Sequence, residues 1–154
     1  MQKKQIRSWK KVFVDDLNYV SYELKDIVAK PAVIFLEGEL GAGKTTFSKN
    51  FHNDPEGSSP TYSLINEHKD ILHADFYRVK EREDIIHLEL PLYLEDKNFL
   101  LIEWGFQHLS NIMPEIPDSF SYYVLEIHVN DKENREKTDQ FSRDFQLYSL
   151  KLDF

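Results

Sequence analysis

A glycine-rich loop directly follows a short apolar run in the first third of this chain. The run, Ala32 to Leu36, contains two β-branched residues and a phenylalanine, which is typical of a strand buried on both faces of a parallel sheet. The loop, Gly38 to Thr45, matches the Walker A pattern G-x-x-x-x-G-K-[ST]. A buried strand that enters such a loop and continues into a helix predicts an α/β fold.

The residue types of this loop predict phosphate binding. Glycines let consecutive backbone N–H groups turn toward phosphate oxygens, and the N-terminus of the following helix favours an anion. We expect Lys44 to reach the β- and γ-phosphates and the hydroxyl of Thr45 to bind Mg²⁺. The competing interpretation is a glycine-rich turn without a ligand. The residues expected to contact the nucleotide are Glu39, Leu40, Gly41, Ala42, Gly43, Lys44, Thr45 and Thr46.

Two acidic residues are candidates for a second part of the site. Glu103 directly follows the apolar run Asn98 to Ile102, which resembles a second buried strand. If that strand is parallel to the first, Glu103 emerges beside the loop, because ligands lie at the carboxyl ends of parallel strands. Asp75 shares a strand face with His73 and Tyr77. For each acid, the alternative is a residue that simply faces solvent.

Hydrophobic spacing predicts the remaining elements. A helix should begin with a cap at Asp15 or Asp16 and end at Pro31. The other expected elements are a hairpin of 63–68 and 71–77, a helix from 81 to 90 stopped by Pro91, and two late antiparallel strands at 121–129 and 145–152. The basic segment before Trp9 is interpreted as a packed or frayed terminus. The predicted architecture is a mixed, mostly parallel sheet flanked by helices, in a single domain spanning 1–154.

Composition narrows the function classes. The net charge is −8, with 27 acidic against 19 basic residues, which argues against tight nucleic-acid binding by this chain. No apolar run approaches the roughly 20 residues that a membrane span needs. The absence of cysteine excludes thiolate chemistry and fits a reducing, cytoplasmic environment. The sequence therefore predicts a nucleotide-binding protein of the cytoplasm.

Four motifs occur in this chain in an order that resembles the order seen in one protein family. The Walker A loop is followed by Ser59-Pro60-Thr61-Tyr62, then by His73-Ala74-Asp75-Phe76-Tyr77-Arg78, and then by Ile102-Glu103-Trp104. This succession, over about residues 12–130, resembles the TsaE (YjeE) family of P-loop ATPases, which acts in bacterial tRNA N6-threonylcarbamoyladenosine modification. The chain departs from the usual family pattern at Gly105, where a proline commonly follows the Glu-Trp pair.

The resemblance implies a role for each matching residue. Thr45 and Glu103 would hold Mg²⁺, and Asp75 would support the metal or the attacking water. Thr61 would sense the γ-phosphate, and Trp104 would lie next to the nucleotide. Lys44 completes the implied catalytic group. The implied activity is a Mg²⁺-dependent ATPase, weak alone, that works with TsaB- and TsaD-like proteins and resets that transferase assembly between turnovers.

Two other functions use the same loop. A small-molecule kinase would carry an arginine-rich lid, whereas the segment 81–94 has one arginine and several acids. A nucleotide-sensing adaptor would bind without hydrolysis. The lack of an Asn-Lys-x-Asp motif favours adenine over guanine, so that ATP or ADP is the expected cofactor.

Overall fold

A computed structural model of the chain describes residues 1–52, 64–130 and 141–152. The strands are β1 (Gln2–Val12), β2 (Ala32–Glu37), β3 (Ile65–His68), β4 (Ile71–Asp75), β5 (Phe99–Glu103), β6 (Ser121–Val129) and β7 (Arg143–Lys151). The α-helices are α1 (Leu17–Ile27), α2 (Lys44–His52), α3 (Arg82–Ile86), α4 (Leu90–Leu94) and α5 (Leu109–Ile112).

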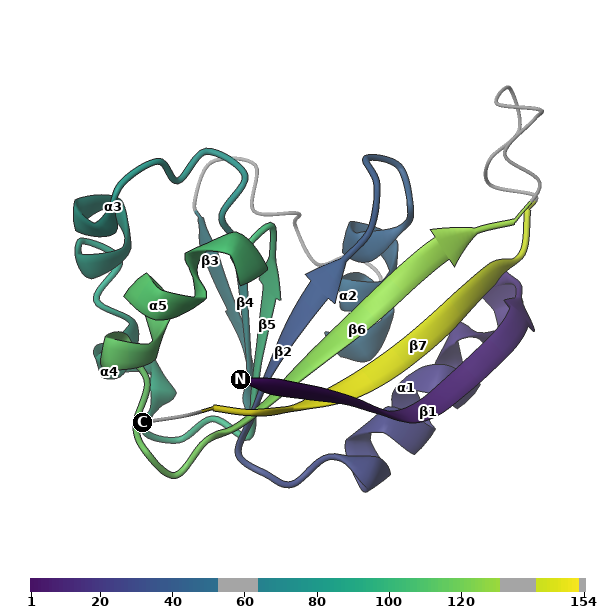
Figure 1. Ribbon diagram of the computed structural model, residues 1–154, viewed down its shortest axis with the longest axis horizontal. Coiled ribbons are helices and arrows are strands. Elements are labelled where there is room, and N and C mark those ends of the chain that lie inside the picture. The colour runs from purple at the N-terminus through teal and green to yellow at the C-terminus, as the bar shows by residue number, and fades with distance from the viewer. Residues whose placement is uncertain (53–63, 131–140, 153–154) are drawn as a thin grey trace.

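The seven strands form one mixed sheet in the order β1-β7-β6-β2-β5-β4-β3 (Figure 1). Strands β6, β2, β5 and β4 run parallel to one another, and β1, β7 and β3 are antiparallel to their neighbours. The predicted mixed, mostly parallel sheet is therefore confirmed. So are the hairpin of β3 and β4 and the late antiparallel pair of β6 and β7.

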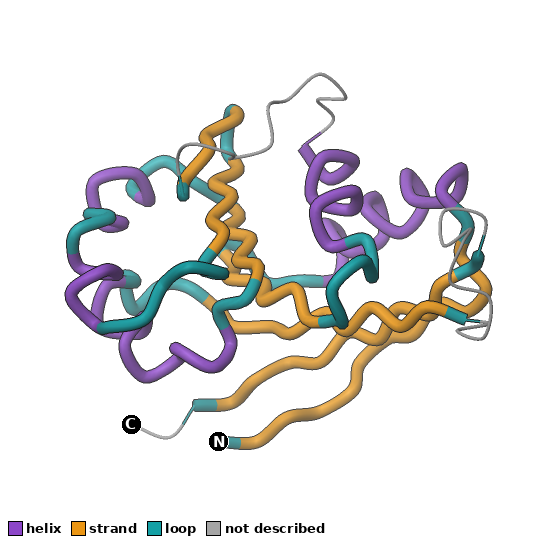
Figure 2. The backbone as a smooth tube through the Cα atoms, turned by 90° about the horizontal axis from the view of Figure 1, so that it is seen from above, coloured by secondary structure: helices purple, strands orange, loops and turns teal. Residues whose placement is uncertain are grey.

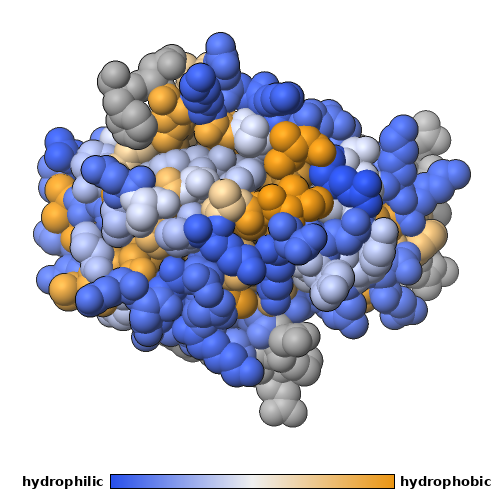
Figure 3. Space-filling model, turned by 90° about the horizontal axis from the view of Figure 1, so that it is seen from below, coloured by the Kyte–Doolittle hydropathy of each residue, from blue (hydrophilic) through white to orange (hydrophobic). Residues whose placement is uncertain are grey.

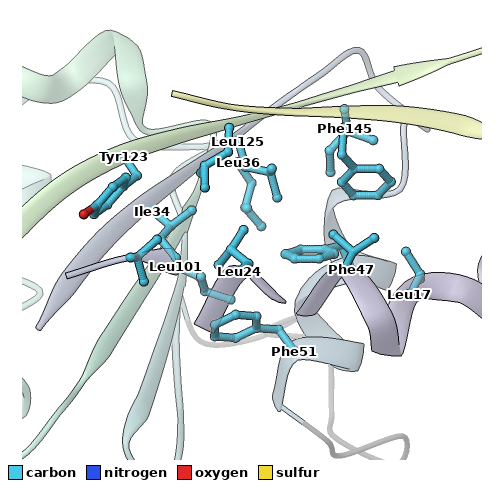
Figure 4. Close-up of a cluster of buried hydrophobic side chains, with 14 of the residues drawn as sticks. Leu17, Leu24, Ile34, Leu36, Phe47, Phe51, Leu101, Tyr123, Leu125 and Phe145 are labelled. Carbon is cyan, nitrogen blue, oxygen red and sulfur yellow. The ribbon is translucent and has the colours of Figure 1, made fainter. Parts of the chain in front are cut away.

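Helices cover both faces of this sheet, with α1 and α2 on one side and α3 to α5 on the other (Figure 2). Side chains of β2 alternate between the two cores: Ile34 and Leu36 pack with α1 and α2, and Val33 and Phe35 pack toward the other helices. The first core also holds a phenylalanine cluster from α2 and β7 (Figure 4). This burial on both faces explains why β2 is apolar at consecutive positions.

Three sequence-based expectations need correction. The basic segment before Trp9 belongs to β1, an edge strand paired with β7, so of the two predicted alternatives the packed terminus is observed and the frayed one is wrong. Asp16 is the N-cap residue of α1, as predicted, but its side chain makes no capping hydrogen bond to this helix; its carboxylate instead accepts the backbone N–H of Phe13 at 3.0 Å. The predicted helix 81–90 ends at Ile86, and Pro91 lies in the first turn of α4, where its missing N–H costs little.

Among the described residues, no helix combines the length and the apolar character required to cross a bilayer. Viewed from the side opposite the loop that follows β2, the surface is mainly hydrophilic with a hydrophobic cluster near its centre (Figure 3).

Candidate functional site

The loop between β2 and α2 packs closely against the sheet. A Cβ at Gly38 would lie 2.7 Å from the carbonyl oxygen of Ile127 in β6, so only glycine permits this approach. Gly43 has a φ of +103°, a conformation that side chains with a Cβ rarely adopt. These two glycines thus fix where the loop lies and how it turns into α2.

Lys44 lies at the start of α2 and is buried, with 5% of its surface exposed. Its Nζ donates to the carbonyl oxygens of Gly38 at 2.5 Å and Glu39 at 3.2 Å. The same atom lies 3.8 Å from the centre of the Trp104 ring. Desolvation lowers the pKa of Lys44, and nearby acids, chiefly Glu103, oppose that shift. The Lys44 ammonium therefore folds back onto its own loop. It donates there to carbonyl oxygens, which the oxygens of a bound anion could replace as acceptors.

Glu103 ends β5 beside the loop, as expected for a strand parallel to β2. It is buried, with 2% exposed, and its Oε1 accepts the Thr45 hydroxyl at 2.9 Å. Its Oε2 lies 2.5 Å from Nε2 of His73 in β4. An ionised carboxylate only accepts hydrogen bonds, so Nε2 carries the proton when Glu103 is charged. The structure thereby brings the start of α2, the end of β5 and the middle of β4 together around one carboxylate.

Asp75 is the direct neighbour of Glu103 in the β4–β5 register. Its Oδ1 accepts the backbone N–H of Tyr77 at 2.9 Å, so the carboxylate closes a turn at the end of β4. The Tyr77 ring in turn meets the Trp104 ring edge to face, with centroids 5.2 Å apart. Asp75 and Trp104 thus lie at the same edge of the sheet as the loop.

Three further residues were predicted to contact the nucleotide: Glu39 and Leu40 in the loop, and Thr61 after α2. Leu40 is 79% exposed at the tip of the loop, and Glu39 beside it is exposed as well. Thr61 and its Ser-Pro-Thr motif lie outside the described residues.

A cavity of about 340 Å³ adjoins the start of α2. Arg143 of β7 forms part of its wall, and its Nε donates to the carbonyl oxygen of Ala42 at 2.7 Å. Neither Arg143 nor the segment after β1 was predicted from sequence, because both reach the loop through strands far away in the chain. The cavity is lined by Val12, Phe13, Val14, Leu17, Gly43, Thr46, Arg143 and Phe145.

The donor set beside the loop suits magnesium. A hydroxyl and a carboxylate, Thr45 and Glu103, already lie in contact, and Mg²⁺ prefers such oxygen ligands. In the described part of the chain, no group of three or more His, Cys, Asp or Glu side chains could hold a metal by itself. Mg²⁺ takes few protein ligands and completes its shell with phosphates and water.

A family model and individual relatives of this chain were compared with it, and they agree with one another on the family. A family model described as "Threonylcarbamoyl adenosine biosynthesis protein TsaE" matches residues 14–139. A tRNA threonylcarbamoyladenosine biosynthesis protein TsaE of Bacillus subtilis is 35% identical over 114 residues, covering 66% of this chain and 68% of that protein. One of Rickettsia conorii is 32% identical over 139 residues, covering 79% and 78%.

The fold is similar to a solved structure. The crystal structure of Bacillus subtilis YdiB superposes with a TM-score of 0.57 at 25% sequence identity, covering 98% of this chain and 89% of that one.

Proposed function

The chain belongs to the TsaE family, which acts in tRNA threonylcarbamoyladenosine biosynthesis, and from this premise we propose that it binds and hydrolyses ATP for that pathway. The observation that carries the proposal is the partly buried contact of Thr45 with Glu103, made where β2 and β5 end side by side. It joins a phosphate-binding loop to a carboxylate from a neighbouring strand. Both parts are needed for hydrolysis rather than binding alone.

The residues of the loop would hold the phosphates. Backbone N–H groups around Ala42 and the N-terminus of α2 would receive the oxygens. Lys44 would exchange the carbonyl oxygens of Gly38 and Glu39 for phosphate oxygens. Thr45 and Glu103 would hold Mg²⁺, which when bound neutralises charge on the phosphates. Asp75 would orient the attacking water, and Thr61 would contact the γ-phosphate.

The cavity at Gly43 and Thr46 supports an adenine nucleotide. It adjoins the loop, its walls are mostly apolar, and Phe13 offers an exposed ring on which a base could stack. ATP and ADP are therefore the proposed ligands.

Isolated turnover should be slow. Arg143 lies beside the loop, but its Nε donates to the Ala42 carbonyl at 2.7 Å and its Nη1 to the Phe141 carbonyl at 2.9 Å, so these two donors, which an arginine finger would offer to a transferring phosphoryl group, are engaged within the fold. We therefore propose that TsaB- and TsaD-like proteins complete the site, and that hydrolysis in the cytoplasm resets their assembly between turnovers.

The test is ATP turnover by the chain alone and with purified TsaB and TsaD. The proposal expects stimulation of the wild type by the partners. Glu103→Gln should lower turnover by about 100-fold or more and leave ATP affinity at saturating Mg²⁺ nearly unchanged, because the amide keeps the shape but loses the charge that faces the metal. Calorimetry measures the affinity.

Each failure has a different meaning. Partners that neither bind nor change turnover would overturn the assigned role. Full turnover by Glu103→Gln would overturn the site. Nucleotide binding without turnover under every condition would favour an adaptor, and phosphate transfer to a metabolite would favour a kinase.

A further inference from the structure

His73 lies beside the proposed metal site and takes no part in the hydrolysis proposed for it. It is 3% exposed, and its Nε2 lies 2.5 Å from Oε2 of Glu103. Replacing a buried pair of this kind with apolar residues of the same size is often neutral or stabilising. Packing alone therefore does not account for a buried histidine at this point.

The two oxygens of Glu103 have different partners. Oε1 meets the Thr45 hydroxyl at 2.9 Å, and Oε2 meets His73. When the Thr45 hydroxyl turns toward a bound ion, the contact with His73 is the one that still fixes the carboxylate plane. A ligand held by such an outer partner needs less reorganisation when the metal arrives.

The histidine is itself held by the helix that carries Thr45. The ring of His52, in the last turn of α2, lies edge-on to His73 with centroids 5.6 Å apart. Helix α2 thus contacts the His73–Glu103 pair from both of its ends, with Thr45 at one and His52 at the other.

We propose that His73 is a positioning residue, which orients the Glu103 carboxylate toward Mg²⁺ through the contact of Nε2 with Oε2. This inference rests on the proposed nucleotide function. It adds that the affinity for magnesium depends on a residue of β4 that touches neither the metal nor the nucleotide.

The test compares three substitutions at this position. His73→Gln places an amide nitrogen near the position of Nε2, His73→Asn is too short to reach Oε2, and His73→Leu removes the donor. ADP affinity is measured by calorimetry in EDTA and across a Mg²⁺ titration. His87→Leu, in the exposed turn after α3, is the matched control. Melting temperatures report folding.

The proposal expects His73→Asn and His73→Leu to need about 10- to 100-fold more Mg²⁺ for half of the gain in ADP affinity. Their affinity in EDTA should stay at the wild-type value, and His73→Gln should restore most of the magnesium response. If His73→Leu does not fold, the Gln and Asn pair decides the same question.

Two results would overturn the inference in distinguishable ways. A wild-type chain whose ADP affinity ignores Mg²⁺ would end the proposed function, and this inference with it. A wild type that responds to Mg²⁺, together with Asn and Gln variants that match it or lose affinity equally in EDTA, would end only this inference and leave His73 a packing residue.

Discussion

At the scale of single residues, Lys44 and Trp104 form a contact that should report nucleotide binding. The ammonium lies 3.8 Å from the ring centre, and a phosphate would draw it away. We expect Mg-ADP to change the fluorescence of wild-type protein. Trp104→Phe should abolish that change, because the second tryptophan, Trp9, lies in β1. An unchanged signal at saturating ligand would place Trp104 outside the site.

Removing the charge of Lys44 should weaken binding itself. Hydrogen bonds to charged groups contribute about 1.5–3 kcal/mol, so Lys44→Ala should raise the Kd for ADP by about 10- to 100-fold. Lys49→Ala, in the last turn of the same helix, is the control and should leave the Kd unchanged. Calorimetry on both variants checks this, and equal affinities would contradict the placement of the phosphates.

At position 105, where the usual family pattern has a proline, this fold leaves no room for a Cβ, which accounts for the glycine. A Cβ there would lie 2.2 Å from Cγ2 of Ile102, a side chain that is fully buried. Gly105→Ala should therefore lower the free energy of unfolding by about 1–3 kcal/mol, as overpacking does. Urea denaturation measures this, with the exposed Gln107→Ala as control. A fully stable Gly105→Ala would mean that Ile102 moves aside freely.

The loop residues and Glu103 could be predicted from the sequence as parts of one site, because each follows a recognisable buried strand. The contact between His73 and Glu103 could not be predicted in this way, because a cross-strand contact depends on which strands become neighbours and on the register of their pairing. Arg143 was missed for the same reason, since its contact with Ala42 depends on β7 pairing with β6 and on β6 pairing with β2.

At the scale of elements, β1 is held against α1 by side-chain contacts that could not be predicted from its sequence. Trp9 is 5% exposed and donates from Nε1 to Glu23 of α1 at 3.0 Å, and Arg7 binds the same carboxylate with distances of 2.8 and 2.9 Å. Lysine is a poor strand former, so the lysine-rich segment gave no strand signal. Its lysines instead suit an edge strand, where charge blocks pairing with other chains.

Removal of this anchor should loosen β1. Trp9→Ala should lower the free energy of unfolding by about 3 kcal/mol, the lower end for large aromatic truncations, because β1 is at the edge. The neighbouring exposed Lys10→Ala should change it by less than about 0.5 kcal/mol. Because β1 leads into the cavity wall, ADP affinity should fall in Trp9→Ala alone. Equal stability of both variants would show that β1 is not part of the cooperative fold.

At the scale of the whole molecule, alkaline stability should depend on Tyr122. Burial, helped by Asp118, raises the pKa of its hydroxyl to about 12. An unfolded tyrosine ionises near pH 10, so between pH 10 and 12 only the unfolded state has lost the proton. The native state binds more protons there, and stability falls as the pH rises.

The measurement is urea unfolding from pH 9 to 11.5. Wild type should lose more stability than Tyr122→Phe, by less than about 1.4 kcal/mol per pH unit because the ring is partly solvated. Tyr22→Phe, at a position 77% exposed, should follow the wild type. Parallel curves for wild type and Tyr122→Phe would show that this hydroxyl ionises as freely in the fold as outside it.

The pairing of β1 with β7 has a consequence for synthesis on the ribosome. The phosphate loop is translated early, but the cavity beside it takes one wall from the segment after β1 and another from Arg143. A nascent chain that carries the complete loop therefore still lacks the enclosure for a base until β7 has emerged. If the cavity holds the base as proposed, full nucleotide affinity is expected only after β7 has emerged and paired with β1.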